Sequence, residues 1–363
     1  MASSLNIVVL FGGQSGEHDV SLSSAAYIID TLKTCPDYKV LPVGISRQGR
    51  WYAYSGPTQA MREGSWQEEG PTAPATLVPD AGKPFLFTQR QGQTISYPVH
   101  CVFPVLHGLK GEDGSIQGML EMAGIPFVGC GMAACALAMD KALAKRLFKE
   151  RGIAQTPWRE LDLDSWRALG LKGVEELVAG LAYPLFVKPA RGGSSLGISR
   201  VNDPAHLAQA LDLAFESDRK VIMEEGVQGR ELEIAALGGY QDPALSPVGE
   251  IVPDRDFYDY DSKYEASSAS QLIIPAPLTK EEETGLREMA VRAWQALDCY
   301  GLSRIDFFLT RDGRLLLNEI NTMPGFVKIS MYPRLFRAAG YGDAQVLREL
   351  IDLALARQDQ IQD

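Results

Sequence analysis

The first third of the chain alternates short apolar runs with helical periodicity. A continuous apolar run at residues 6–11 is typical of a buried parallel strand, and residues 40–45 and 99–106 predict two further strands. Helical patterns follow the first and the last of these segments, at residues 20–33 and 115–123. Strands that alternate with helices in this way predict an α/β domain built on a parallel sheet.

The remainder of the chain continues this alternation with two interruptions. The segment 49–93 is rich in Gly, Pro, Gln and Thr and has little periodicity, so we expect an irregular surface segment. A tyrosine-rich run at 257–264 leads into a small polar loop, 265–270, that is suited to a lid. A capping box at Thr279 and Glu282 begins one of the later helices. We expect strands at 126–130, 184–189, 198–201, 220–225 and 231–237, and helices at 133–150, 279–297 and 343–356.

A predicted β-hairpin near the C-terminus carries the candidate chemistry. Two runs of strand-forming residues, 305–310 and 315–320, flank an Asp-Gly pair at 312–313 that is typical of a hairpin turn. If this pair forms a two-residue turn, Asp306 faces Glu319 across the hairpin. The register therefore predicts two opposed carboxylates on one face of a buried sheet.

The same register places Arg304 opposite Asn321, on the face that carries the two carboxylates. Opposed like charges weaken a strand pair by roughly 0.2–1 kcal/mol, and a divalent cation would reverse that effect. Two carboxylates and an amide oxygen suit Mg²⁺, especially Mg²⁺ that is shared with phosphates. The alternative is a solvated hairpin face. The apolar flanks and the turn at 322–325 favour the metal site.

The composition restricts the partners and the compartment. The chain has 363 residues and a net charge of −11, which argues against a nucleic-acid or membrane-surface partner. We expect neither a signal peptide nor a spanning helix, because the apolar run at 6–11 is too short for either. Cysteines without paired spacing predict reduced thiols in a cytoplasmic protein; they are Cys35, Cys101, Cys130, Cys135 and Cys299.

Glycine-rich loops follow several predicted strands. The loop 12–18 lacks the spacing of a dinucleotide site, and Glu17 at the helix start could equally serve as a macrodipole partner. The loop 190–197 is either a phosphate nest or an unliganded hairpin, and it is no P-loop because it lacks GK[ST]. A strand break at 226–229 would expose backbone edges to a base. His107 is either a ligand contact or a hydrogen-bonded loop residue.

Together these features describe a site for ATP and Mg²⁺ without a P-loop, and the chain resembles the D-alanine–D-alanine ligase family of the ATP-grasp superfamily. The motifs that carry the resemblance cover almost the whole chain in the family's order. They are FGGQSGEHDVS at 11–21, HGLKGEDGSIQGMLE at 107–121, MDK at 139–141, FVKPARGGSSLGIS at 186–199, FYDYDSKY at 257–264, SRIDFF at 303–308 and NEINTMPGFVKISMYP at 318–333.

The resemblance implies an α/β ATP-grasp fold with an N-terminal Rossmann-like domain on a parallel sheet. It implies three domains: an N-terminal substrate domain (1–130), a central ATP-grasp subdomain (131–228) and a C-terminal ATP-grasp subdomain with the metal and substrate site (229–363). In the implied reaction, ATP phosphorylates the carboxylate of a first D-alanine, and the amine of a second attacks the acyl phosphate. The dipeptide feeds peptidoglycan precursor synthesis, and the family is commonly dimeric.

The resemblance also implies roles for residues at the matching positions. The implied catalytic residues are Glu17, Ser194, Tyr264, Arg304, Gly325 and Ser330. The implied nucleotide-binding residues are Lys141, Lys188, Ser194, Ser195, Glu224, Glu225, Val227, Glu231, Phe257 and Lys263. The implied ligands of two Mg²⁺ ions, with Mn²⁺ as an alternative, are Asp306, Glu319 and Asn321, and further substrate contacts are expected at His107 and Met331.

The second substrate is open between D-alanine and D-serine. Tyr264 resembles the residue of D-alanine-adding enzymes, and Met331 stands where D-serine ligases tend to carry arginine. Residues 43–56, however, resemble D-Ala–D-Ser ligases of the vancomycin-resistance type. The pair at 327–328, Val-Lys, also departs from the Thr-Ser that is more usual there. D-alanine is the prediction and D-serine the alternative.

Other functions have less support from the residues. A glutathione synthetase-like ligase would not share the GGQSGEH motif or the lid tyrosine, Tyr264. A catalytically silent nucleotide-binding protein would have lost Arg304, Glu319 or Lys263, and all three are present. A Rossmann-type oxidoreductase would need a GxGxxG turn and an acidic residue after the second strand, and neither is evident in the sequence.

Overall fold

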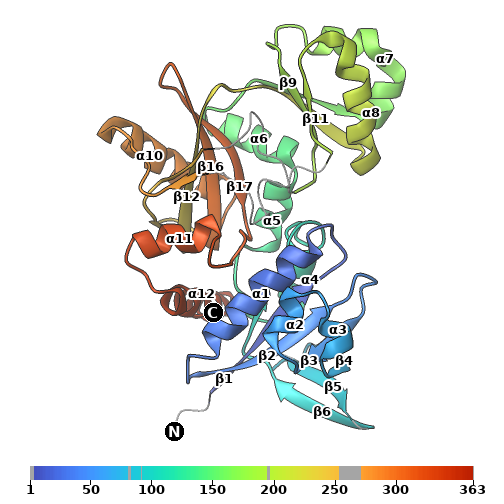
Figure 1. Cartoon of the computed structure of the whole chain (residues 1–363), viewed down its shortest axis with the longest axis vertical. Coiled ribbons are helices and arrows are strands. Elements are labelled where there is room, and N and C mark those ends of the chain that lie inside the picture. The colour runs from blue at the N-terminus through green and yellow to red at the C-terminus, as the bar shows by residue number, and fades with distance from the viewer. Residues whose placement is uncertain (1–3, 81–82, 91, 194–196, 253–270, 363) are drawn as a thin grey trace.

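The computed structural model describes residues 4–80, 83–90, 92–193, 197–252 and 271–362, without the side chains of 359–362. Three sheets succeed one another along the chain (Figure 1). The first sheet lies in the N-terminal part of the chain. The second sheet stands at the far end of the molecule from the first, and the third lies between them.

The first sheet is parallel at its centre, as predicted. β1 (Leu5–Gly12) pairs in parallel with β2 (Tyr38–Ile45) on one side and with β7 (Cys101–Pro104) on the other. All but the first residue of β1 are buried, which explains its unbroken apolar run. The helices α1 (His18–Leu32) and α4 (Ser115–Met122) follow β1 and β7, so the loops at their starts meet at the same edge of the sheet.

The prediction of an irregular segment at 49–93 is wrong. This part of the chain extends the first sheet as an antiparallel meander. Its short strands contain Thr, Gln and Pro, and one face of β4 is exposed, so the apolar periodicity is weak. The elements are β3 (Trp51–Tyr54), α2 (Thr58–Arg62), α3 (Trp66–Glu69), β4 (Thr72–Val78), β5 (Phe85–Arg90) and β6 (Gln93–Pro98).

The predicted strand at 126–130 is reduced to a single parallel bridge between Phe127 and Val102. The chain turns away at Gly129, whose φ of +104° favours glycine, and enters the next helix. Two helices follow, α5 (Met132–Met139) and α6 (Lys141–Glu150).

The second sheet is antiparallel, in the strand order β10-β9-β11-β8. It is composed of β8 (Trp158–Asp162), β9 (Leu185–Pro189), β10 (Ser199–Val201) and β11 (Lys220–Glu225). Its hydrophobic core includes Val174, Leu211 and Val187. The helices α7 (Leu163–Leu177) and α8 (Leu207–Ser217), with the 3-10 helix η1 (Pro204–His206), pack on this sheet (Figure 1).

The third sheet is also antiparallel, with the predicted hairpin at its edge. Its order is β15-β14-β12-β16-β17, and β13 pairs with β12. The predicted capping box of Thr279 and Glu282 begins α10 (Lys280–Ala296). The strands are β12 (Gly229–Gly238), β13 (Ala244–Leu245), β14 (Gly249–Val252), β15 (Gln271–Ile273), β16 (Gly301–Thr310) and β17 (Leu315–Asn321).

Two hydrophobic clusters position the third sheet. One cluster joins α1 of the first sheet to α11 (Met331–Ala338) and α12 (Asp343–Gln362). The other places α5 and α6 against the opposite face of β16 and β17. The hairpin is therefore held between the N-terminal part of the chain and α6. No helix in the described part of the chain is long and apolar enough to cross a membrane.

Candidate active site

The predicted hairpin is present, but its turn is one residue longer than predicted. A three-residue loop, 311–313, joins the strands, and the Thr310 N–H donates to the Arg314 carbonyl at 3.0 Å. The last residue of this loop has a φ of +80°, as three-residue hairpin loops require. Leu309 therefore pairs with Leu315 near the turn, whereas a two-residue turn would have paired it with Leu316.

A β-bulge at Asn318 restores the predicted pairing at the polar patch. Phe307 pairs with Leu317, whereas the preceding residue, Asp306, pairs with Glu319. The predicted opposition of the two carboxylates is therefore confirmed. It depends on the bulge, because an unbroken ladder would place Asp306 opposite Asn318.

Arg304, which pairs with Asn321 as predicted, is held by carboxylates on two strands. Its Nε and Nη2 donate to Oδ1 and Oδ2 of Asp306 at 2.8 and 2.7 Å. Oε2 of Glu233, on the neighbouring β12, lies 3.0 Å from the Nε of Arg304. Burial would lower the pKa of Arg304, but Asp306 and Glu233 outweigh it and hold the pKa well above its usual range. The guanidinium is therefore permanently charged.

The donor set of this patch fits Mg²⁺. Asp306 and Glu319 offer opposed carboxylates, and Asn321 lies close enough to donate Nδ2 to Asp306 Oδ2 at 2.9 Å. No group of three His, Cys, Asp or Glu side chains suited to a metal occurs among the described residues, so the candidate set is limited to two carboxylates and one amide. Hard oxygen ligands that leave room for phosphate oxygens are what Mg²⁺ prefers.

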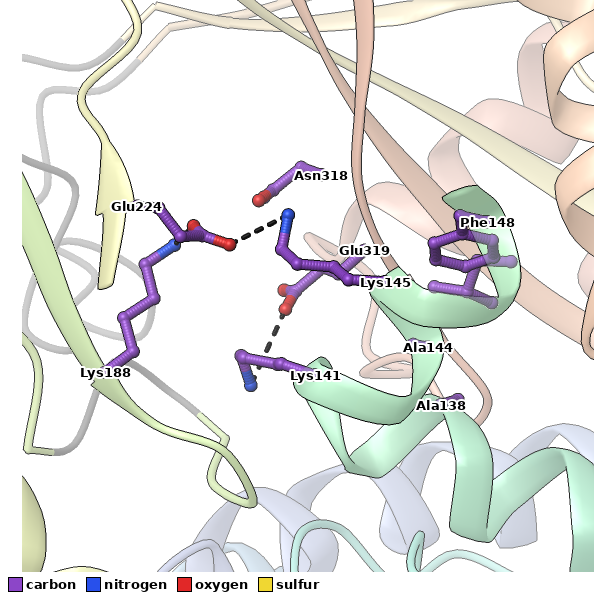
Figure 2. A pocket seen from close by; sticks show the side chains of 10 residues that line it. Ala138, Lys141, Ala144, Lys145, Phe148, Lys188, Glu224, Asn318 and Glu319 are labelled. Atoms are coloured by element: carbon purple, nitrogen blue, oxygen red, sulfur yellow. Dashed lines mark hydrogen bonds and ion pairs between the residues drawn. The ribbon is translucent and has the colours of Figure 1, made fainter. Parts of the chain in front are cut away.

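The helix α6 brings Lys141 to this patch. The Lys141 Nζ lies 3.8 Å from Oε2 of Glu319 and donates to the carbonyl of Gly192 at 2.7 Å (Figure 2). Lys141 therefore connects these carboxylates with the loop 190–197, referred to below as the Gly-Ser loop. It supplies a positive charge where the sequence predicts phosphates.

Glu224, on β11, is a buried carboxylate between two lysines (Figure 2). Lys188 of the adjacent β9 donates to its Oε2 at 2.6 Å, and the Nζ of Lys145 lies 2.8 Å from its Oε1. Burial would raise the pKa of Glu224, but the two ammonium groups outweigh it and lower the pKa to about 2. Burial would likewise lower the pKa of Lys188, and Glu224 raises it. The carboxylate is therefore charged at neutral pH.

One cavity between the second and third sheets is lined by the charged side chains of Lys141, Lys145, Lys188, Glu224 and Glu319, whereas Arg304, Asp306 and Asn321 lie outside its lining. It measures about 10 Å³ among the side chains. Asn318 and Glu319 both line it, although they are consecutive residues. An unbroken strand would send one of them to the other face, so this arrangement is a second effect of the bulge.

The remaining predicted base and ribose contacts lie where the second sheet passes into the third. Oε1 of Glu225, the last residue of β11, accepts the backbone N–H of Ala182 at 3.0 Å. Val227 lies half-buried in the break between β11 and β12, and Glu231 lies on β12. The predicted strand break is therefore present, next to Glu224.

Glu17 lies where the N-terminal part of the chain meets the Gly-Ser loop. Its side chain is buried and forms no capping hydrogen bond with α1. A Cβ built on Gly108 or on Gly193 would lie 2.5 Å from Glu17 Oε2, so a side chain at either position would displace the carboxylate from its present place. The structure thus brings Glu17 beside the loop that carries Ser194 and Ser195.

His107 is buried, and both of its ring nitrogens have partners. Nδ1 lies 2.9 Å from the carbonyl oxygen of Met323, and Nε2 lies 3.1 Å from the Oγ of Ser24. Burial lowers the pKa of His107. The geometry favours the hydrogen-bonded loop histidine over a direct ligand contact through the ring.

Ser330 and Gly325 face each other at the start of α11. The Oγ of Ser330 accepts the N–H of Val327 at 3.2 Å, and a Cβ on Gly325 would approach that Oγ to 3.2 Å. Met331 is 6% exposed, and its Sδ lies 3.0 Å from where a Cβ on Gly249 would stand. Its side chain therefore packs into the core, which leaves its backbone N–H as its means of contacting a substrate.

Glu112 was not predicted, although it belongs to the HGLKGEDG motif. Its Oε2 accepts the N–H of Gly108 at 2.7 Å, and its Oε1 accepts the N–H of Met323 at 3.2 Å. It thus connects the loop after β7 with the loop after the hairpin. Burial, with a further contribution from the charge of Glu17, raises the pKa of Glu112 to about 8.

This raised pKa predicts a pH-dependent stability. The unfolded carboxyl loses its proton near pH 4.5, whereas the folded one keeps it until about pH 8. Stability should therefore fall as the pH rises through this window. Relative to the Glu112→Gln variant, the wild type should lose up to about 4 kcal/mol between pH 5 and pH 8.5 in urea unfolding. The control is Asp113→Asn, and an equal slope for wild type and Glu112→Gln contradicts the prediction.

Several predicted site residues lie outside the described part of the chain. They are Ser194, Ser195, Phe257, Lys263 and Tyr264. Their roles therefore stay predictions of the sequence. The sequence analysis also missed Lys145 and Glu233, because neither lies in one of the motifs. Only the structure identifies them, through the contact of Lys145 with Glu224 and that of Glu233 with Arg304.

Two family models match the two halves of the chain. Residues 6–130 match the family model described as D-ala D-ala ligase N-terminus, and residues 147–352 match D-ala D-ala ligase C-terminus. A D-alanine--D-alanine ligase of Thermoanaerobacter sp. is 44% identical over 355 residues, 96% of each chain. D-alanine--D-alanine ligase A of Salmonella typhimurium is 41% identical over 356 residues, 97% of this chain and 96% of the relative.

Solved structures give the same architecture. The VanG D-Ala:D-Ser ligase of Enterococcus faecalis superimposes with a TM-score of 0.85 at 37% identity, covering 97% of this chain and 100% of that one. The D-alanine-D-alanine ligase of Coxiella burnetii has a TM-score of 0.84 at 33% identity, covering 99% and 97%. The predicted fold class is thereby confirmed.

Proposed function

This chain belongs to the D-alanine–D-alanine ligase family, and on that basis we propose that it joins two D-alanine molecules at the expense of ATP. The products would be D-alanyl-D-alanine, ADP and phosphate, and the dipeptide would serve peptidoglycan precursor synthesis. The observation that supports the activity most directly is the cavity in which lysines of α6 and β9 meet Glu319, one of the two opposed carboxylates of the hairpin.

We propose that the nucleotide lies between the second and third sheets. Lys141 and Lys188 would bind its phosphates as point charges, and Glu224 would accept a hydrogen bond from the adenine amino group. The Oε1 atom of Glu224 is buried and accepts no well-aligned hydrogen bond within the described structure, which supports this role. We assign the base and ribose contacts to Glu225, Val227, Glu231 and Phe257.

We assign the metal site to Asp306, Glu319 and Asn321. These residues would hold two Mg²⁺ ions, or Mn²⁺, whose charge offsets that of the β- and γ-phosphates. Arg304 lies on the same face as Asp306, so its guanidinium would face the carboxylate that is phosphorylated and then attacked. With the backbone N–H of Gly325, it would stabilise the tetrahedral oxyanion.

Glu17 would bind the ammonium group of the first D-alanine. Its carboxylate lies against Gly193, next to Ser194, and this supports a connection of the first domain to the Gly-Ser loop. We propose that Glu17, Ser194 and Tyr264 form a hydrogen-bonded trio. With Ser195 and Lys263 near the transferred phosphate, the closed loops would keep water from the acyl phosphate.

We propose D-alanine as the second substrate, with its carboxylate on Ser330 and on the N-terminus of α11. D-serine is the alternative, because VanG, a D-Ala:D-Ser ligase, is structurally similar to the chain. The side chain of Met331 packs in the core and offers no partner for a serine hydroxyl. An unpaired hydroxyl would be penalised in such a pocket, and this favours D-alanine.

The test is phosphate release with ATP and Mg²⁺, followed by identification of the products. With D-alanine alone, we expect D-alanyl-D-alanine and one phosphate for each dipeptide. Adding D-serine in excess should yield less than about one tenth of mixed product, since an unpaired side-chain hydroxyl costs about 1–3 kcal/mol. Adding D-lactate should yield no depsipeptide, because Tyr264 resembles the residue of D-alanine-adding enzymes. Mixed D-Ala–D-Ser as the main product would instead establish the alternative, and no phosphate release with any of the three would contradict the ligase.

We further propose that the enzyme is a homodimer of three-domain subunits, divided at about residues 130 and 228. Light scattering after size-exclusion chromatography tests the dimer. Limited proteolysis with mass spectrometry tests the domain boundaries, because exposed linkers are cleaved first.

A further inference from the structure

We propose that Lys145, on α6, is a positioning residue that holds Glu224 in place to accept the adenine amino group, and thereby sets the preference for adenine over guanine nucleotides. The inference rests on the nucleotide site proposed above. It concerns a residue that belongs to none of the motifs, and it starts from the burial of that residue.

Lys145 is 2% exposed, which is rare for a lysine. Its ammonium has two polar neighbours in the described structure: Oε1 of Glu224 at 2.8 Å and the Oγ of Thr156 at 3.4 Å. A buried ammonium needs such a counter-ion, since desolvation is otherwise strongly unfavourable. Lys145 and Glu224 therefore fix each other's positions.

The contact leaves Glu224 able to accept a hydrogen bond. The ammonium of Lys145 lies 2.8 Å from Oε1 and uses at most one of the two lone pairs of that oxygen. Oε2 already accepts from Lys188. A donor that enters the cavity would thus find its acceptor at Oε1, and the 6-amino group of adenine is such a donor. Guanine presents a carbonyl oxygen at the same position, which a carboxylate repels.

The two lysines on Glu224 differ in their surroundings. The side chain of Lys188 is 15% exposed, whereas that of Lys145 is 3% exposed. Lys188 is also assigned to the phosphates, so bound nucleotide draws part of its charge away from Glu224. Within the described part of the chain, the Lys145 ammonium pairs with no anion besides Glu224, and it stays as the constant counter-ion that keeps Glu224 charged.

Helix geometry explains why α6 supplies this lysine. Lys141 and Lys145 are four residues apart and so lie on the same face of the helix. Figure 2 shows the first pointing to Glu319 and the second to Glu224. The helix α6 therefore positions one cation, Lys141, at the proposed metal site and a second cation, Lys145, at the proposed base site.

The experiment compares Lys145→Met with the wild type and with Lys149→Met, an exposed lysine one turn further along α6. For Lys145→Met, we expect the KM for ATP to rise about tenfold to a hundredfold, the value of one charge-assisted hydrogen bond, with kcat within about threefold. The ratio of kcat/KM for ATP to that for GTP should fall about tenfold or more. Lys145→Arg should restore most of the preference, and Lys149→Met should match the wild type.

Binding of the non-hydrolysable β,γ-imido analogues of ATP and GTP, measured by calorimetry, separates this inference from the proposed activity. If the wild type binds the ATP analogue but forms no dipeptide, the ligase function fails while the binding ratio still tests Lys145. If Lys145→Met does not fold, Lys145→Gln carries the same expectation. A folded Met or Gln variant with the wild-type ATP-to-GTP ratio, or with kcat and kcat/KM lowered equally, overturns the proposal.

Discussion

Replacing Glu319 by glutamine is expected to lower kcat for dipeptide formation by about a hundredfold to a thousandfold at ordinary Mg²⁺ concentrations. The substitution keeps the shape of the side chain but removes one of the two opposed carboxylates of the hairpin. A metal ion contributes several kcal/mol of charge stabilisation in phosphoryl transfer, so a weakened site affects the rate strongly. The measurement is coupled ADP release over a range of Mg²⁺ concentrations.

The same substitution should leave the fold intact. The Glu319 side chain is 30% exposed, and its ion pair with Lys141 is a long one of 3.8 Å. Such pairs contribute at most about 1 kcal/mol to stability. The matched control is Asp312→Asn, the same change at the exposed loop of the same hairpin. Wild-type activity of Glu319→Gln at low Mg²⁺, or an equal loss in Asp312→Asn, would refute the metal assignment.

The second large effect is expected for Arg304→Lys. Lysine keeps the charge but loses the planar fork that donates to both oxygens of Asp306. Without that geometry, the cation cannot be held both on Asp306 and toward the developing oxyanion. Removal of a single oxyanion donor typically lowers kcat about a hundredfold to a thousandfold, and we expect the same here. The KM for ATP should change little, because the nucleotide contacts lie on other residues.

Arg230→Lys is the control for this substitution. Arg230 also forms a bidentate pair, donating to Oε1 and Oε2 of Glu250 at 2.9 and 2.7 Å on the same sheet. Unlike Arg304, it is not paired with the carboxylates proposed to bind the metal. Both variants should lose similar stability in thermal unfolding, and only Arg304→Lys should lose turnover. Comparable losses of kcat in the two variants would show that Arg304 acts through stability.

The hairpin shows how far its sequence alone determines a site. The Asp-Gly pair and the flanking apolar runs predicted the hairpin and the opposed carboxylates, and both are present. The predicted turn was wrong by one residue, and the bulge at Asn318 compensates for the difference. A turn signal and strand propensities do not reveal a bulge, because an extra residue is accommodated through contacts with the neighbouring elements.

The segment 49–93 illustrates the opposite error. Its weak periodicity predicted irregular structure, whereas it forms β3 to β6 of the first sheet. Buried residues such as Trp66 anchor it from the short helix α3, against Phe11 of β1. Tertiary packing, rather than local propensity, decides such strands.

By itself, the sequence determined the alternation of strands and helices, the residue types of the site and the family to which the chain belongs. These features depend on local chemistry and on motifs whose spacing can be counted along the chain. Only the tertiary structure decided that Lys145 faces Glu224, that Glu233 holds Arg304 and that Glu112 connects two loops. Each of these contacts joins residues from different elements, and their charges are stabilised only when folding removes them from water and brings a partner close.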